Sequence, residues 1–230
     1  MATLRQFRRT CVAPTDCGCA SVLSSGLAPM SSRVPPVAVA LLAIALIATS
    51  ASVRGADVEA GRRKSEACVA CHGGDGNATI PGTPSLAGHP AYYTHWQLVM
   101  FRNERRRDPQ MTPMAAKLSD EDMADLSEYY AAQAPRLRPG RPTIDSATRG
   151  AGERLANTHR CTSCHGPAFM GQQAVPRLAG QDHEYLLRRL RGYKTQTTSD
   201  LEGFMTAAAQ PLTNEEVEIL ARYIASLEPR

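Results

Sequence analysis

The sequence predicts an all-α protein built from two copies of one helical domain. Three observations carry this prediction: a motif that occurs twice, further residues that recur at nearly the same interval, and apolar positions at helical spacing without a strand pattern. The motif is Cys-x-x-Cys-His, at residues 68–72 and 161–165, and its copies lie 93 residues apart. A chain of 230 residues is long enough for two such domains.

The region after each motif repeats as well. Pro-Ser-Leu-Ala-Gly at 84–88 returns as Pro-Arg-Leu-Ala-Gly at 176–180, and Met111 returns as Met205. Other positions recur in the same order: Tyr93 and Tyr185, Leu98 and Leu190, Leu118 and Leu212, Leu126 and Leu220, Tyr129 and Tyr223. The offset drifts between 92 and 94 residues, which indicates small loop insertions between the copies of a duplicated domain.

Helices are expected around each motif. Residues 59–67 form a short helix that leads into the first motif, and residues 90–104 carry apolar side chains at helical spacing. The glycines and prolines of residues 73–88 predict a loop between them. Two later helices begin with capping-box patterns, Ser119-x-x-Asp122 and Thr213-x-x-Glu216.

The domain boundaries follow from the breaks between these helices. We expect the first domain at residues 56–135, a linker at 136–141 and the second domain at 142–230. Residues 133–142 contain three prolines and a glycine, which do not continue a helix.

Residues 1–55 are interpreted as an N-terminal extension and signal peptide. The apolar run at 37–48 follows Arg33 and precedes small residues, which is the layout of a secretory signal. The run is short for a membrane span, which needs about 20 apolar residues, so a retained anchor is the less favoured alternative. Met30 fits the start of such a signal better than Met1 does. Three of the seven cysteines lie before Met30: Cys11, Cys17 and Cys19.

The net charge of +4 belongs to this leader. Residues 1–55 hold five of the 26 basic and one of the 22 acidic residues, which leaves 21 of each in the remaining chain. A balanced mature chain gives no support for nucleic-acid binding. Within it the charge is uneven, because residues 56–135 sum to −3 and residues 136–230 sum to +3.

The two Cys-x-x-Cys-His motifs predict two covalently attached c-type haems. Each motif supplies two thiols for thioether bonds to the haem vinyl groups, and the adjacent His is an axial ligand of the iron. The attachment residues are Cys68, Cys71, Cys161 and Cys164, and the His ligands are His72 and His165. A zinc site needs a fourth ligand, and a thioredoxin-like redox pair expects a βαβ context. Two motifs at a domain interval favour haem over both alternatives.

The second axial ligand decides the chemistry, since methionine closes the iron for electron transfer and an open position permits catalysis. Met111 and Met114 compete in the first copy. Met111 recurs as Met205, whereas position 114 corresponds to Ala208. We therefore predict Met111 and Met205 as the ligands and Met114 as a packing residue.

The surroundings of the two ligating histidines can be predicted too. A metal-bound His normally donates its other ring N–H to a nearby acceptor, and the backbone carbonyls of Pro84 and Pro176 are the candidates. The remaining histidines do not recur in register between the copies: His89, His95, His159 and His183. Of these only His95 is a candidate for the second axial ligand of a haem iron, and we expect it to be a surface or half-buried side chain instead.

Taken together, these residues resemble the dihaem cytochrome c4 family. The resemblance rests on paired Cys-x-x-Cys-His-Gly motifs, each followed by Pro-x-Leu-Ala-Gly and then by Met and a capped helix, from about residue 56 to residue 227. It implies two tandem class I cytochrome c domains, each wrapped around one haem c and related by pseudo-twofold symmetry. It also implies His/Met ligation of each iron by the residues named above. The basic cluster at residues 105–107 is a departure from the family.

The resemblance implies a one-electron carrier of a periplasmic respiratory chain, without catalysis of its own. Its partners are then redox proteins, a membrane cytochrome complex as donor and a terminal oxidase as acceptor, and the carrier is a monomer that can associate with the membrane. The main alternative is a dihaem electron-transfer subunit of a periplasmic dehydrogenase. A dihaem peroxidase is a further rival, but it needs an iron that peroxide can reach.

Overall fold

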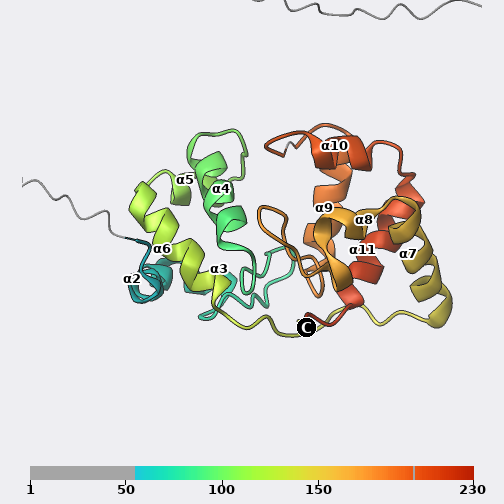
Figure 1. The fold of residues 1–230 in the computed structure, drawn as a ribbon, viewed down its shortest axis with the longest axis horizontal. Helices are drawn as coiled ribbons and strands as arrows, with labels where there is room; N and C mark the ends of the chain where they lie inside the picture. The colour runs from blue at the N-terminus through green and yellow to red at the C-terminus, as the bar shows by residue number, and fades with distance from the viewer. Residues whose placement is uncertain (1–54, 199) are drawn as a thin grey trace, which may run out of the picture. The chain divides into compact units, whose positions relative to one another are not determined.

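The computed structural model describes residues 55–198 and 200–230 (Figure 1). The predicted leader, with Met30 and the three cysteines before it, therefore lies outside the described residues except for Gly55. The described residues form one compact unit. The described residues contain no β-strand and only one isolated bridge, between Gln172 and Val175, so the predicted all-α class is confirmed.

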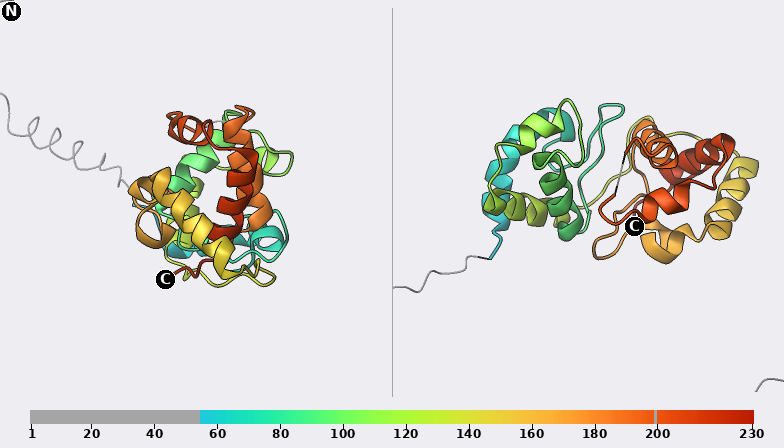
Figure 2. Two further views of the ribbon diagram at one scale, coloured as in Figure 1. Left: turned by 90° about the vertical axis from the view of Figure 1, so that its right-hand side faces the viewer. Right: turned by 90° about the horizontal axis from the view of Figure 1, so that it is seen from above.

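The described residues contain twelve helical segments, which fall into two groups along the chain. The first half contains α2 (Val58–Lys64), the 3₁₀ helix η1 (Ser65–Cys68), α3 (Val69–His72), α4 (Ala91–Arg102), α5 (Met111–Ala115) and α6 (Asp120–Ala131). The second half contains α7 (Ser146–Thr158), α8 (Cys161–His165), the 3₁₀ helix η2 (Pro167–Phe169), α9 (His183–Lys194), α10 (Phe204–Ala209) and α11 (Asn214–Ser226). Within each half the first helix packs on the last, as the views in Figure 2 show. None of the helices within the described residues has the length and apolar character needed to cross a bilayer.

Both predicted capping boxes are confirmed. The Ser119 hydroxyl accepts a bond from the Asp122 N–H, and the Asp122 carboxylate accepts one from the Ser119 N–H in return. Thr213 and Glu216 make the same exchange at the start of α11. These bonds satisfy N–H groups that a helix cannot pair internally, which fixes where each C-terminal helix begins.

The helix predicted at 59–67 is shorter than expected. It ends at Lys64 and continues as the 3₁₀ turn η1. The Ser65 hydroxyl donates a hydrogen bond of 2.7 Å to the Arg62 carbonyl, which competes with the α-helical ladder at that point. The tighter turn leads directly into the first Cys-x-x-Cys-His motif.

A glycine lets the first and last helices of each half cross closely. A Cβ on Gly61 of α2 would lie 2.1 Å from the Asp125 carbonyl oxygen of α6. A Cβ on Gly152 of α7 would lie 2.3 Å from the Cβ of Tyr223 in α11. Because the backbones approach this closely, the helix pair that begins and ends each domain tolerates no side chain at these positions.

Gly152→Ala is expected to lower the free energy of unfolding by about 1–3 kcal/mol, because the new methyl overlaps the Tyr223 side chain. Gly150→Ala is the matched control in the same helix. A Cβ there meets only the end of the Arg154 side chain at 3.4 Å, so the better helix propensity of alanine should leave stability unchanged or raise it. Chemical denaturation of both variants measures the difference, and equal effects would contradict the close crossing.

The Pro-x-Leu-Ala-Gly segments make the same backbone bonds in both halves. The Gly88 N–H donates to the Tyr130 carbonyl at 2.9 Å, and the Gly180 N–H donates to the Ile224 carbonyl at 3.2 Å. Both glycines have positive φ, +67° and +65°, which glycine adopts without strain. The loop that follows each motif is thereby fixed to the last helix of its own half.

One position in these loops differs between the halves. Gly76 has φ +76°, and a Cβ there would lie 2.7 Å from the Tyr130 ring. Its counterpart is Phe169, which keeps a left-handed φ of +60° and is 2% exposed. The counterpart of Tyr130 is Ile224, which is also buried. The aromatic ring thus comes from Tyr130 of the last helix in the first half and from Phe169 of the loop in the second. The change from Gly76 to Phe169 is compensated by the change from Tyr130 to Ile224.

Candidate haem centres

The first Cys-x-x-Cys-His motif spans the end of η1 and all of α3. Cys68 is half-buried and Cys71 is exposed. His72 is buried, and its Nδ1 donates a hydrogen bond of 2.9 Å to the Pro84 carbonyl. That bond places the ring proton on Nδ1 and leaves the Nε2 lone pair for a metal.

The second motif has the same geometry. Cys161 is half-buried and Cys164 is exposed. His165 closes α8, is buried, and donates from Nδ1 to the Pro176 carbonyl at 3.1 Å. The predicted pairing of each His with a proline carbonyl is therefore confirmed in both halves.

The protonation states of the two histidines suit iron binding. Burial lowers the pKa of His72 and of His165, which favours the neutral imidazole that binds a metal. Burial also raises the pKa of Cys68 and of Cys161. These residues fit haem c, because in each half a Cys-x-x-Cys pair is followed directly by an oriented imidazole that burial keeps neutral.

The two predicted methionines occupy matching backbone positions. Met111 is the first residue of α5, and its N–H donates to the Asp108 carboxylate at 3.0 Å. Met205 is the second residue of α10, and its N–H donates to the Asp200 carboxylate at 2.9 Å. Both side chains are half-buried, whereas Met114 is 39% exposed. The register between the halves thus holds in the structure, although Met ligation itself stays a prediction.

The remaining histidines lie elsewhere. His95 is half-buried with its ring 6.3 Å from that of Trp96, in keeping with the predicted non-ligating side chain. His159 faces Glu216 at 3.6 Å, and His183 faces Glu218 at 3.4 Å. His89, by contrast, is buried where the two halves meet, within 3.5 Å of Gln181.

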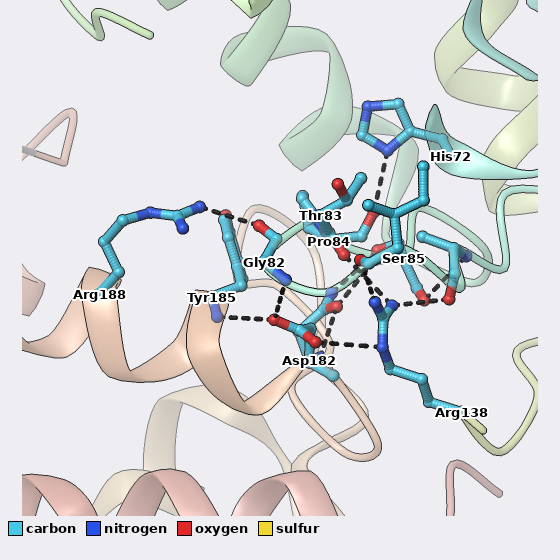
Figure 3. Close-up of polar contacts among 12 residues, drawn as sticks. His72, Gly82, Thr83, Pro84, Ser85, Arg138, Asp182, Tyr185 and Arg188 are labelled. Carbon is cyan, nitrogen blue, oxygen red and sulfur yellow. Dashed lines mark hydrogen bonds and ion pairs between the residues drawn. The ribbon is translucent and has the colours of Figure 1, made fainter. Parts of the chain in front are cut away.

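A buried polar network joins the first-half loop to the second half (Figure 3). Asp182 accepts a bond of 2.9 Å from the Gly82 N–H and pairs with Arg138 at 3.1 Å. The Arg138 guanidinium also donates to three loop carbonyls, those of Ala78, Ile80 and Thr83. Arg138 lies in the segment predicted as a linker, so this segment fastens the two halves together and is not a free tether.

Two further buried residues cross between the halves. Gln181 bonds to the backbone N–H and carbonyl of Ser85, and Arg177 donates to the Ala87 carbonyl at 3.1 Å. Burial lowers the pKa of Arg177 to about 10. Sequence reasoning missed these contacts, because a Gln, an Arg and a linker Arg carry no pattern of their own. The one available signal was the position of Arg177 and Gln181, within and next to the repeated Pro-x-Leu-Ala-Gly segment.

Stability is expected to fall in acid because of His89. Burial, with a smaller contribution from Arg177, lowers the pKa of His89 from 6.5 to about 3. The Tyr93 ring and Gln181 also pack against it. As the pH falls below 6.5, His89 binds a proton in the unfolded chain but stays neutral in the folded chain. The free energy of unfolding should therefore drop by about 2 kcal/mol by pH 5.

Denaturation of the wild type and of His89→Gln between pH 7 and pH 5 measures this contribution. The variant carries the residue found at the equivalent position 181, and it should lose about 2 kcal/mol less over this range. Equal pH dependence in the two proteins would show that His89 takes up its proton in the folded state.

Comparison with known proteins agrees with this tandem geometry. A family model described as Cytochrome c matches residues 58–132 and again residues 150–228. Cytochrome c4 of Thiocapsa roseopersicina is 36% identical over 182 residues, covering 74% of this chain and 93% of that protein. The thiosulfate dehydrogenase electron acceptor of Stutzerimonas stutzeri (strain A1501) is 39% identical over 173 residues, covering 70% of this chain and 79% of that protein.

A solved structure also supports the tandem cytochrome c fold. Reduced recombinant cytochrome c4 from Pseudomonas stutzeri superposes with a TM-score of 0.69 at 30% identity, covering 76% of this chain and 100% of that chain. Cytochrome c domains bind haem, so the zinc and dithiol alternatives for the two motifs are set aside. The chain belongs to the cytochrome c family, and its tandem domains make it a dihaem member of the cytochrome c4 group, an electron carrier with two covalently attached haem c groups.

Proposed function

We propose that this protein is a one-electron carrier in a periplasmic respiratory chain and passes electrons toward a terminal oxidase. One haem is attached through Cys68 and Cys71, with His72 and Met111 as axial ligands. The other is attached and ligated by the matching residues Cys161, Cys164, His165 and Met205. The observation that carries the proposal is the similar arrangement of both centres. Each has a His that donates to a proline carbonyl and a Met whose backbone N–H donates to a preceding carboxylate, which comes from a different position in each half.

The bound haem supplies reversible one-electron oxidation and reduction of its iron. The chain's own residues hold that iron in one coordination state. The proline carbonyls orient His72 and His165 through Nδ1, and burial of both rings keeps water away from them. Met111 and Met205, as ligands, would close each iron to a substrate, which would favour electron transfer over peroxidase activity.

The domain organisation and the cellular location belong to the same proposal. The two cytochrome domains extend over residues 56–135 and 142–230 and are joined by residues 136–141. Residues 1–55 contain the signal peptide, and export delivers a monomer to the periplasm. The apolar run at 37–48 after Arg33 supports export.

A spectroscopic redox titration of the purified mature protein tests this function. We expect two haems per chain, a methionine–iron charge-transfer band in the oxidised protein, and two one-electron steps. Turnover of peroxide by the isolated protein would overturn the carrier assignment in favour of the peroxidase. A single haem per chain would overturn the ligand set.

The uneven charge predicts salt-dependent docking. Residues 56–135 carry −3 and residues 136–230 carry +3, so each half attracts an oppositely charged surface. Electron-transfer rates with the physiological donor and acceptor should fall as ionic strength rises, because salt screens charges over about 8 Å at 0.15 M. Stopped-flow measurements across a salt series check this. Rates that stay constant with both partners would mean that the exposed charges serve only solubility.

A dehydrogenase subunit is the second candidate. Two of the relatives are named as thiosulfate dehydrogenase electron acceptors, at 39% and 32% identity. In this role the two haems receive electrons from a catalytic subunit. Co-purification with a periplasmic dehydrogenase, and reduction of the cytochrome by it in the presence of substrate, would favour this candidate. Fast reduction by a membrane cytochrome complex without such a subunit would favour the respiratory carrier.

A further inference from the structure

The peptide group between Pro84 and Ser85 is bonded at both ends. Its carbonyl accepts the Nδ1 proton of His72 at 2.9 Å. Its N–H donates to the side-chain Oε1 of Gln181 at 2.8 Å. One peptide group of the first half therefore connects a haem ligand to a residue of the second half.

The Gln181 side chain is held in a single orientation. It is 1% exposed, and its Oε1 also accepts the Asp182 N–H at 2.9 Å. Its Nε2 donates to the Ser85 carbonyl at 2.9 Å. Rotating the amide by half a turn would point its NH₂ group at two N–H donors, so the oxygen must face the peptide.

An acceptor on the N–H side of a peptide strengthens the carbonyl on the other side, because hydrogen bonds in a chain polarise one another. A stronger carbonyl draws the Nδ1 proton of His72 and makes the imidazole a better electron donor. Donation to iron stabilises the oxidised state, and hydrogen bonding around the ligands is one of the means by which proteins set a haem potential.

The second haem lacks this connection. The counterpart of Gln181 is His89, whose Nδ1 has no partner among the described residues. The counterpart of Ser85 is Arg177, and within residues 55–198 and 200–230 its N–H makes no hydrogen bond to the first half. Instead, a Cβ on Gly171 would lie 2.5 Å from that nitrogen, so loop backbone covers it.

We propose that Gln181 of the second half lowers the reduction potential of the His72 haem through the Pro84–Ser85 peptide and leaves the His165 haem unaffected. Gln181 is a positioning residue in this role, since it acts through another group. The inference rests on the proposed function, in which His72 ligates a haem iron. Contact between the halves thereby becomes a determinant of the first haem's potential.

Gln181→Met tests the proposal in the haem-loaded protein, because methionine has a similar shape and does not accept from the Ser85 N–H as an amide oxygen does. We expect a rise in the first haem's potential with the second unchanged, and an upfield shift of the His72 Nδ1–H signal in the NMR spectrum of the reduced protein. The two potentials are assigned through the methyl signals of the ligating methionines. Gln181→Glu keeps an acceptor, so it should not raise the first potential.

Arg188→Ala is the matched control. It removes another bond between the halves, from Arg188 to the Gly82 carbonyl at 2.9 Å, and leaves the Pro84–Ser85 peptide intact. Loss of an exposed positive charge cannot raise a potential, so a rise in this variant would point to general loosening and overturn the proposal. Unchanged potentials in Gln181→Met, equal shifts of both haems, or a rise in Gln181→Glu would overturn it as well.

A measurement on the wild type covers the case in which Gln181→Met fails to fold. The His72 Nδ1–H signal should lie further downfield than that of His165, and the reverse order would refute the relay. The wild-type measurement also distinguishes failure of the proposed ligand set from failure of the proposed role of Gln181. If His72 is not a haem ligand, the proposed ligand set fails. If the ligand set holds and the variants shift nothing, only the role of Gln181 fails.

Discussion

Asp182→Ala is expected to lower the free energy of unfolding by about 3–5 kcal/mol, because it leaves the Arg138 guanidinium buried without its counter-charge. The two side chains are 5% and 9% exposed and lie 3.1 Å apart. Asp182 also caps α9 by accepting the Tyr185 N–H at 2.8 Å. Loss of that cap adds to the destabilisation. Denaturation of the haem-loaded protein measures the sum.

Arg136→Ala is the control from the same segment. Arg136 pairs with Asp75 at 2.9 Å, but its side chain is 72% exposed. Such surface pairs contribute about 1 kcal/mol or less, so this variant should unfold close to the wild type. If both variants lost the same stability, the burial of the Arg138–Asp182 pair would not be what stabilises the contact between the halves.

Met111→Ala and Met205→Ala are expected to have the largest effects on the haem centres. Each substitution should remove about half of the methionine–iron charge-transfer intensity and lower the potential of one haem, because methionine ligation raises the potential. Spectra of the oxidised variants together with redox titrations measure both effects. The fold should persist, since each methionine is only half-buried.

Met114→Ala distinguishes ligation from packing. Met114 lies in the same short helix as Met111, is 39% exposed, and has Ala208 as its counterpart. We expect its spectrum and potentials to match the wild type. If Met114→Ala lost the charge-transfer band and Met111→Ala kept it, the ligand assignment from the repeat would be wrong.

The helix starts and the hydrogen bonds of the ligating histidines could be predicted from the sequence, because each depends on residues close together in the chain. The capping boxes need only two residues three positions apart, and both formed as expected. The pairing of His72 and His165 with proline carbonyls was predictable because the Pro-x-Leu-Ala-Gly segment recurs at a fixed interval after each motif. The register between the copies also singled out Met111 over Met114, and Met111 and Met205 lie at the start of equivalent short helices, α5 and α10, while the choice of ligand stays a prediction.

The contacts between the halves could not be predicted in the same way. Arg138 lies among prolines and other arginines, a composition typical of an exposed linker, yet it is 7% exposed. Its partner Asp182 is 44 positions further along the chain. Gln181 likewise acts on a loop 96 residues earlier. Such pairings depend on how two finished domains approach each other, and no periodicity within either domain encodes that approach.

The exchange between Gly76 with Tyr130 and Phe169 with Ile224 has a consequence for how the duplicated gene segments can evolve. Recombination between the repeats tends to make them alike. A crossover that brought phenylalanine to position 76 would collide with Tyr130, and one that brought glycine to position 169 would leave an unfilled space in the core cluster that contains Phe169 and Ile224. Only a joint replacement of loop and helix is tolerated. The paired substitution therefore disfavours sequence exchange between the repeats. The sequences around the two haem centres can then change independently.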